Sequence, residues 1–266
     1  MHAQTPVKPT PSSPPPSLER EFFKNILRDQ KAIWTSPFHL GRTDAKWLMP
    51  SGIGLMALIT TDRITGDEIA ESGRSLSASR AISYGGSVYG VGAAAGTFYL
   101  MGRMKNNYRE RETGVLIAEA ALDSTIVEAA LKGVTRRARP LDGVERSEFF
   151  DGGSSFPSGH STEAWAVATV IANEYKHRRA VQVAAYAMAS AVSVARFTGQ
   201  KHYLSDVLAG SALGYGIGKY VYNTHHQISL AATDDTGPVS TSWWPTISPQ
   251  FNRHVHAYGI GLTWSF

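Results

Sequence analysis

Three clusters of residues have the types and spacing needed for chemistry on an anion. The first is a basic run at the end of a predicted helix, formed by Lys132, Arg136, Arg137 and Arg139. Four like charges in eight residues repel one another unless an anion lies nearby. Pro140 excludes the α conformation for Arg139, which we therefore expect in a loop. Taken alone, a basic helix end is usually a solvated surface or a favourable partner of the helix dipole.

The second cluster is the segment Pro157-Ser158-Gly159-His160, directly before an apolar helical run. The proline and the glycine predict a tight turn, and the helix that begins there presents unpaired backbone N–H groups. Such a helix N-terminus can bind an anion. The Ser158 hydroxyl could donate a further hydrogen bond, and His160 lies in the first turn. Alone, the segment could equally be a capped helix with an incidental histidine.

The third cluster places Arg196 before His202 and Asp206, which are four residues apart. That spacing puts His202 and Asp206 on one helix face. The Asp206 carboxylate could accept the Nδ1 proton of His202 and leave Nε2 as a nucleophile, as in catalytic triads. A single His–Asp pair at this spacing is common on protein surfaces, so its weight comes from the other two clusters.

Together, Lys-x6-Arg-Pro, Pro-Ser-Gly-His and Arg-x5-His-x3-Asp resemble the three-part signature of the type 2 phosphatidic acid phosphatase/haloperoxidase superfamily. The motifs cover Lys132 to Asp206, and the helix pattern extends the resemblance to about Ala78–Tyr222. The sequence departs from the family at Ala195, where a serine is frequent; one hydroxyl is lost, but no charge or nucleophile.

The resemblance implies a role for each residue. Lys132, Arg139 and Arg196 would bind the phosphate oxygens, with Ser158 and the Gly159 N–H completing the site. His202 would attack phosphorus to form a phosphohistidine, with Asp206 holding its tautomer. His160 would protonate the leaving oxygen and then activate water. No metal or other cofactor is expected, because three cations supply the charge neutralisation.

Two other functions remain open at this stage. In a vanadium-dependent haloperoxidase the same residues would hold vanadate, with His202 as its ligand, whereas in a phosphatase vanadate would be an inhibitor. A non-catalytic anion- or lipid-binding envelope protein would keep the site for docking only. A basic stripe interleaved with aromatic residues is missing from the sequence, which argues against nucleic-acid binding.

The fold that must position these residues is predicted to be mainly α. Helical spacing of apolar residues predicts a helical bundle of the superfamily's type, with these helices: Leu18–Trp34, Ala78–Gly102, Arg109–Leu131, Gly159–His177, Val181–Arg196 and Tyr203–Tyr222. A loop up to Pro50 and a short apolar stretch at Ile53–Ile59 separate the first two. We interpret the apolar runs as core helices of a mostly soluble bundle, with membrane-surface association open.

Domain boundaries follow from composition and periodicity. Residues 1–17 are predicted to be a disordered proline-rich leader, 18–225 the helical phosphatase domain, and 226–266 a loop and hairpin. The hairpin pairs Trp243–Ile247 with the alternating segment Tyr258–Phe266, with a turn at Pro249 and Asn252. Other histidines are expected in exposed loops, although His225-His226 and His254-x-His256 could bind a metal.

Composition restricts the function further. The 266 residues carry a net charge of +4, which permits an anionic partner without selecting one. The chain has no cysteine, so thiolate metal sites and cysteine nucleophiles are excluded. The leader and the mild hydrophobicity favour the bacterial cell envelope, and within it the periplasm. The expected substrate is a phosphorylated small molecule or, preferably, a lipid phosphate or diphosphate.

Overall fold

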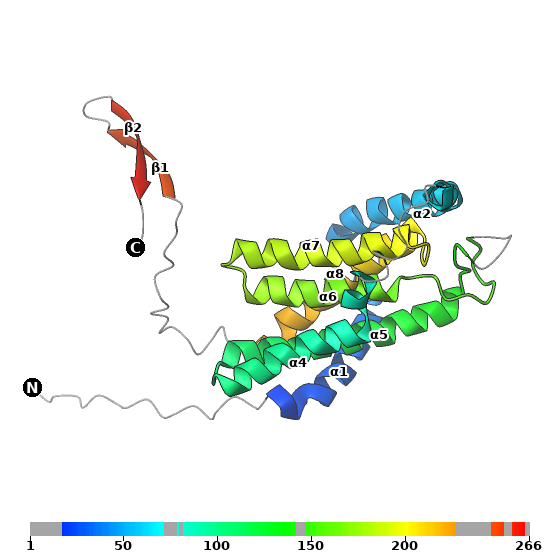
Figure 1. Ribbon diagram of the computed structural model, residues 1–266, viewed down its shortest axis with the longest axis horizontal. Helices are drawn as coiled ribbons and strands as arrows, with labels where there is room; N and C mark the ends of the chain where they lie inside the picture. The colour runs from blue at the N-terminus through cyan, green and yellow to red at the C-terminus, as the bar shows by residue number, and fades with distance from the viewer. Residues whose placement is uncertain are drawn as a thin grey trace, which may run out of the picture. The chain divides into compact units, whose positions relative to one another are not determined.

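The computed structural model describes residues 18–71, 79, 82–141, 147–226, 246–252 and 257–263, so the predicted leader lies outside the described residues. The chain divides into two compact units, Met1–His226 and Gln227–Phe266. The first is helical, as expected (Figure 1). Its elements are α1 (Leu18–Thr35), η1 (Ser36–His39), α2 (Arg42–Glu71), η2 (Tyr84–Gly86), α4 (Val88–Met104), α5 (Tyr108–Thr135), α6 (Gly159–Glu174), α7 (Arg179–Thr198) and α8 (Leu204–His225).

The centre of the helical unit is formed by α5, α6 and α8. Their apolar side chains make one core with Val91 of α4, and its fully buried members are Leu116, Ile117, Ala120, Ala166, Val170 and Val221. Burial of such side chains is the main favourable contribution to folding. The core therefore fixes the three helices that carry most of the predicted site residues.

Close contact between α6 and α8 depends on three glycines of α8. Gly210, Gly214 and Gly218 follow one another at four-residue intervals and therefore share a helix face. A Cβ atom at each would overlap a backbone carbonyl oxygen of α6, those of Ser158, Thr162 and Ala166. The small residues predicted to allow close helix approach do so here, and they set the position of the α6 N-terminus against the start of α8.

Two predicted elements differ from the structure. Helix α2 runs through Pro50, where a loop was expected. A proline removes only one helical hydrogen bond, and the residues on both sides continue the helix. Helix α4 begins at Val88 and not at Ala78, because Gly85 and Gly86 lie in η2 and Ser87 caps the new helix by accepting a hydrogen bond from the Gly90 N–H.

The expectation that all apolar runs are core helices is wrong for α4 and α7. Within the described residues, α4 buries only Val91 and Gly102, and α7 buries four small or branched residues. Large apolar side chains on both helices face outward, among them Val88, Tyr89, Leu100, Val183, Met188 and Val194. By length and composition α7 could cross a bilayer, and it is the one described helix that meets both criteria. An outer surface of this kind is typical of a lipid or protein interface.

The second unit contains a hairpin, as predicted, but its first strand shares only residues 246 and 247 with the predicted segment Trp243–Ile247. Strands β1 (Thr246–Asn252) and β2 (Ala257–Thr263) pair antiparallel, with Thr246 opposite Thr263 and Asn252 opposite Ala257. The sequence predicted a turn at Pro249, but this residue lies within β1. A two-stranded sheet tolerates this because each strand is an edge strand and has one side without a ladder partner.

Candidate active site

The predicted site residues come together at one end of the helical unit. Lys132 lies near the end of α5, Ser158 to His160 begin α6, Arg196 lies near the end of α7, and His202 and Asp206 lie at the start of α8. The positive charges of Lys132, Arg139 and Arg196 all act on both His160 and His202. Residues of all three motifs are therefore close enough in space to interact electrostatically, although tens of residues separate the motifs in the sequence.

His202 is buried and held by a backbone carbonyl. Its Nδ1 lies 2.7 Å from the carbonyl oxygen of Ser155 and 3.8 Å from Oδ2 of Asp206. A carbonyl can only accept, so Nδ1 carries the proton and Nε2 keeps its lone pair. The predicted hydrogen bond from Nδ1 to Asp206 is therefore wrong. The free Nε2 that it was meant to produce is nevertheless present.

Asp206 acts on His202 through neighbouring groups. Its Oδ2 accepts hydrogen bonds from the Ser155 hydroxyl at 2.5 Å and from the Tyr203 N–H at 2.9 Å. Its backbone carbonyl accepts from the Ser158 N–H at 3.0 Å. One residue thereby positions the segment that holds His202, the residue that follows His202, and the N-cap of α6.

Arg137 is a structural residue, which the sequence analysis missed. Its guanidinium is fully buried and donates to Oδ1 of Asp206 at 2.6 Å and to Oδ2 of Asp62 at 2.8 Å. It also lies against the rings of Phe149 and Tyr203. The basic run is thus not uniformly available to an anion, because two carboxylates neutralise its central arginine. Asp62, on α2, has no sequence signal that connects it with this site.

The remaining cations differ in how far their side chains are already paired with other groups. Arg139 donates to the Ser154 hydroxyl at 3.2 Å. Arg196 is half-buried, and its Nε has no hydrogen-bond partner among the described residues. Lys132 forms an ion pair with Glu128 at 2.8 Å, a carboxylate that also packs against Gly159. The Glu128 carboxylate would therefore compete with a phosphate for Lys132, and no sequence motif indicated this ion pair.

The N-terminus of α6 has the form predicted from the sequence. Ser158 is the N-cap, and its hydroxyl accepts from the Ser161 hydroxyl at 3.1 Å instead of capping the helix. The N–H groups of Gly159, His160 and Ser161 have no acceptor within the helix, as in any first turn. Gly86 of η2 packs against the His160 carbonyl, where a Cβ atom would overlap it. The first turn is therefore fixed from two sides.

Burial and charge together determine the protonation of His202. Burial lowers its pKa well below the ordinary value, and the charges of Arg196 and Arg139 lower it further; the Ser155 carbonyl opposes them. The imidazole is therefore neutral at pH 7. A buried neutral imidazole with one free nitrogen, beside several cations, can act as a nucleophile toward an anion that those cations bind.

An apolar cavity of about 460 Å³ lies between α6, α7 and α8 beside this site. Phe197 follows Arg196 in the sequence, Leu204 lies between His202 and Asp206, and Val207 follows Asp206; all three line the cavity. Trp165, Val194, Leu208 and Tyr215 continue the lining away from the site. The residues predicted to bind phosphate and the apolar cavity are thus close to each other in the sequence of α7 and α8.

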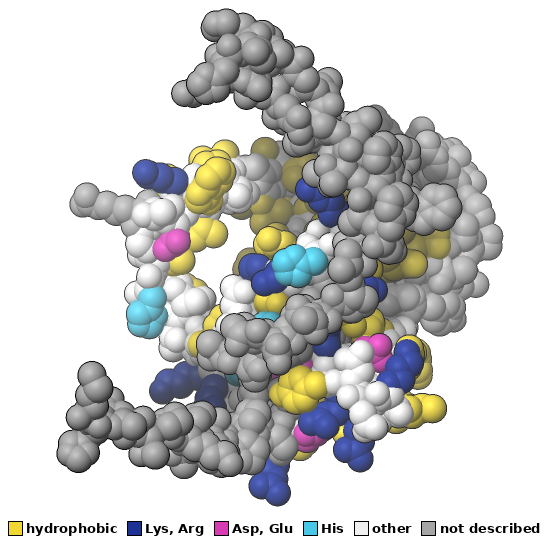
Figure 2. All heavy atoms as spheres, turned by 90° about the vertical axis from the view of Figure 1, so that its left-hand side faces the viewer, with side chains coloured by type: hydrophobic (Ala, Val, Ile, Leu, Met, Phe, Trp, Pro, Cys, Tyr) yellow, Lys and Arg dark blue, Asp and Glu magenta, His cyan; other side chains and the backbone are white. Residues whose placement is uncertain are grey.

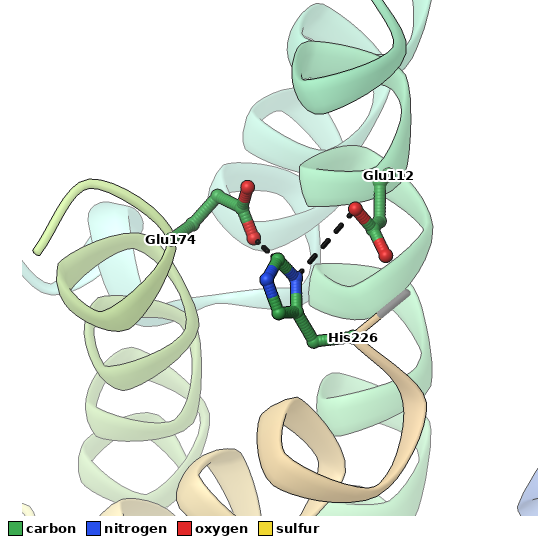
Figure 3. Close-up of side chains that lie close together, drawn as sticks. All are labelled: Glu112, Glu174 and His226. Carbon is green, nitrogen blue, oxygen red and sulfur yellow. Dashed lines mark ion pairs between the residues drawn. The ribbon is translucent and has the colours of Figure 1, made fainter. Parts of the chain in front are cut away.

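His225 and His226 are not the exposed loop histidines that the sequence suggested. His225 ends α8, and its Nε2 lies 2.8 Å from Oδ2 of the buried Asp29. His226 follows it and faces Glu112 of α5 and Glu174 of α6 (Figure 3). Both histidines lie at the end of α8 remote from His202. The histidines at 254 and 256 lie outside the described residues.

Comparison with known proteins finds a matching family model and a partial relative. Residues 113–229 match the family model described as the PAP2 superfamily. A 70-residue segment is 40% identical to a lipid A 1-phosphatase of Porphyromonas gingivalis, and it covers 26% of this chain and 16% of that protein. The match thus spans about one sixth of the relative's length.

The fold also resembles a solved structure, described as the first transmembrane PAP2 type phosphatidylglycerolphosphate phosphatase from Bacillus subtilis. The TM-score is 0.52, the sequence identity is 20%, and the similarity covers 80% of this chain and 98% of the other. At this identity the similarity concerns the fold.

Proposed function

Because the domain within residues 113–229 belongs to the PAP2 superfamily, we propose that the chain is a phosphoric ester hydrolase acting through a phosphohistidine. The observation that carries this proposal is the state of His202. Its Nδ1 proton is held by the Ser155 carbonyl, and its pKa is lowered, so Nε2 is available for attack. The matched lipid A 1-phosphatase and the phosphatidylglycerolphosphate phosphatase support a phosphatase over a haloperoxidase.

Binding of the substrate is the first step. Arg139, Arg196 and Lys132 attract the phosphate oxygens, and the first-turn N–H groups of α6 with the Ser158 hydroxyl orient them. Stabilisation of negative charge spread over the equatorial oxygens is the main requirement of phosphoryl transfer. Three cations meet it with side chains of this protein alone, so the proposed reaction needs no metal ion.

Attack and hydrolysis follow. Burial and the cations around it lower the pKa of His160 to about 4, so His160 is protonated when the negative charge of the bound substrate offsets those cations. Nε2 of His202 then forms a bond to phosphorus while the bond to the leaving oxygen breaks, and protonated His160 donates its proton to that oxygen. His160 then accepts a proton from water, whose oxygen attacks phosphorus. The P–N bond breaks, and its electron pair returns to Nε2, so both histidines regain their starting states as inorganic phosphate leaves. His160 thus acts first as acid and then as base.

We further propose a lipid phosphate or diphosphate as the substrate. The apolar cavity is lined by Phe197 and Leu204, which are close in sequence to Arg196 and His202, so a substrate with an apolar chain attached to its phosphate could fill both. The outward apolar faces of α4 and α7 suit a protein embedded in lipid, where such a substrate resides. A water-soluble phosphomonoester would leave the cavity unused.

Charge distribution supports an orientation in the membrane. The turns between α4 and α5 and between α6 and α7 lie at the end of the unit remote from His202. Exposed basic side chains lie in these turns and at the adjoining helix ends: Arg103, Lys105, Arg109, Lys176, Arg178 and Arg179. Figure 2 looks onto this end, with Lys and Arg side chains around its periphery. Cytoplasmic ends of membrane helices carry such an excess of Lys and Arg. On this basis we propose that the active site faces the periplasmic side of a bacterial membrane.

The cavity provides the test of substrate class. We expect Val194→Trp, which fills the cavity, to raise KM for a long-chain lipid phosphate about tenfold or more while hydrolysis of a soluble aryl phosphate is unchanged. The control is Val183→Trp, an exposed valine of the same helix outside the cavity, which should change neither substrate. Equal effects of both variants on the lipid would contradict the proposal.

The haloperoxidase alternative is tested separately by adding vanadate. Vanadate should inhibit phosphate release, because it occupies the same site. Oxidation of bromide by the vanadate-loaded protein would contradict the phosphatase assignment. Absence of phosphate release from every phosphate ester in a panel of lipid and soluble substrates would favour a binding protein.

A further inference from the structure

A second polar cluster lies at the opposite end of the core helices from the active site. It consists of Glu112 of α5, Glu174 at the end of α6, and His226, the C-cap of α8 (Figure 3). The three helices concerned are those that carry Lys132, the Ser158–His160 turn and Asp206 at their other ends. The residues are 52 and 62 positions apart in sequence, so only the tertiary fold brings them together.

We propose that Glu112, Glu174 and His226 bind a divalent metal ion of the zinc class. One carboxylate oxygen from each glutamate and Nδ1 of His226 lie within 4.8 Å of one another. Nδ1 lies 3.2 Å from Oε2 of Glu174 and 3.6 Å from Oε2 of Glu112. Ligands about 2.0–2.2 Å from a tetrahedral zinc ion are separated by about 3.3–3.6 Å. The two distances from Nδ1 are thus close to the spacing that one shared ion requires, and the two carboxylate oxygens lie within 4.8 Å of each other.

The state of Glu174 is the second observation that indicates a ligand. Its side chain is fully buried, and neither carboxylate oxygen has a hydrogen bond among the described residues. Arg109 lies 3.5 Å from Oε1, which leaves Oε2 directed at His226 and the centre of the cluster (Figure 3). A buried carboxylate oxygen without a hydrogen bond is costly unless a cation is bound nearby.

The histidine is held in the orientation that a ligand needs. The ring of Tyr222, one turn earlier on α8, stacks on the His226 ring with centroids 4.5 Å apart. The His226 N–H donates to the Tyr222 carbonyl at 3.0 Å. Groups that orient a histidine contribute to metal affinity by fixing the nitrogen in place. The His226 side chain is partly exposed, so an ion can reach the site from solvent.

A bound ion would connect the ends of α5, α6 and α8 without taking part in phosphoryl transfer. Its competitor is a proton on Nδ1 of His226, because that nitrogen is the atom that would bind the ion. Metal binding requires the neutral ring. Affinity for the ion should therefore fall as the pH is lowered and His226 is protonated.

The test uses the purified full chain, stripped with EDTA and titrated with Zn²⁺, Mg²⁺ or Ca²⁺ at pH 7.5. We expect one tightly bound Zn²⁺ per chain by elemental analysis, and a thermal midpoint that rises with Zn²⁺ concentration, as ligand linkage requires. Mg²⁺ and Ca²⁺, which prefer more oxygen ligands, should have little effect. Glu174→Gln and His226→Gln should lose both the bound ion and the stabilisation.

The matched control is His177→Gln, which removes an exposed histidine three residues after Glu174. This variant should bind Zn²⁺ as the parent does. The midpoints without metal and the circular dichroism of all variants show whether each one folds. Zinc binding retained in Glu174→Gln and His226→Gln would overturn the proposal. So would a midpoint that rises with falling pH and ignores metal, since the proton of His226 would then be the only cation required.

Discussion

The Nδ1 of His202 lies 2.7 Å from the carbonyl oxygen of Ser155, which fixes the tautomer of the proposed nucleophile. In a catalytic triad a carboxylate has this role. Here the carboxylate of Asp206 binds the Ser155 hydroxyl instead, so it positions the residue that positions the histidine. Orientation of the nucleophile is thus a property of the 153–158 segment as well as of α8.

The Asp206→Asn variant tests whether the Asp206 carboxylate or the Ser155 carbonyl fixes the tautomer of His202. The carbonyl still holds the Nδ1 proton, so the loss of kcat should be well below the roughly 10⁴-fold loss of a triad that loses its tautomer. Stability should fall by about 3–5 kcal/mol, because the buried Arg137 loses one of its two carboxylates. Steady-state kinetics and chemical denaturation measure the two effects. A 10⁴-fold loss of kcat in a fully stable variant would contradict this account.

The neighbouring arginines 137 and 139 should respond in opposite ways. Arg137→Gln leaves Asp62 and Asp206 buried without their cation, so we expect a loss of about 3–5 kcal/mol in stability. Arg139→Gln should leave the thermal midpoint nearly unchanged and lower kcat/KM about 10- to 100-fold, because a charge-assisted bond to phosphate is lost. Thermal melts and kinetics of both variants decide the matter. A stable Arg137→Gln with impaired substrate binding would reverse the roles.

The glycines of α8 offer a test of the helix contact that positions the site. Gly214→Ala places a methyl group against the Thr162 carbonyl and should destabilise the protein by about 1–3 kcal/mol. Gly216→Ala, two residues later on an open face, should be neutral or stabilise by up to about 1 kcal/mol, since alanine is the better helix former. Denaturant titration compares the pair. Equal stability of the two variants would show that close α6–α8 contact is not required.

The sequence predicted which residues gather at one end of the unit better than it predicted which helix faces are exposed. The motifs identified the residues that gather at one end of the unit, because the residue types and spacings that bind phosphate lie within short segments. It could not identify Asp62 or the carbonyl of Ser155, since a distant carboxylate and a backbone atom leave no pattern. For the same reason the sequence grouped Arg137 with the cations available to an anion, since its two acidic partners lie 75 and 69 residues away. Apolar periodicity likewise cannot distinguish a core helix from one that faces lipid, as in α7.

The pH dependence of activity should reflect the lowered pKa of His202. A histidine with a pKa well below its ordinary value of about 6.5 stays unprotonated until the pH is far lower. Protonation of His202 should therefore cause no loss of kcat/KM between pH 7.5 and about 6. In Arg196→Gln one charge that lowers this pKa is removed, so the acidic limb of the profile should move to higher pH.

The control for this shift is Arg178→Gln, an exposed residue at the other end of the same helix. It should leave the pH profile of kcat/KM unchanged. Movement of the acidic limb to lower pH in Arg196→Gln would contradict the proposed electrostatic origin of the His202 pKa.

Rapid quenching of the reaction, followed by mass spectrometry of the peptides, tests the phosphohistidine most directly. The account predicts one acid-labile phosphoryl group on the peptide that contains His202, formed and lost at rates consistent with turnover. His202→Gln should fold as the parent by circular dichroism and show neither the adduct nor phosphate release. A folded His202→Gln that retains activity, or a phosphoryl group on another residue, would contradict the central claim.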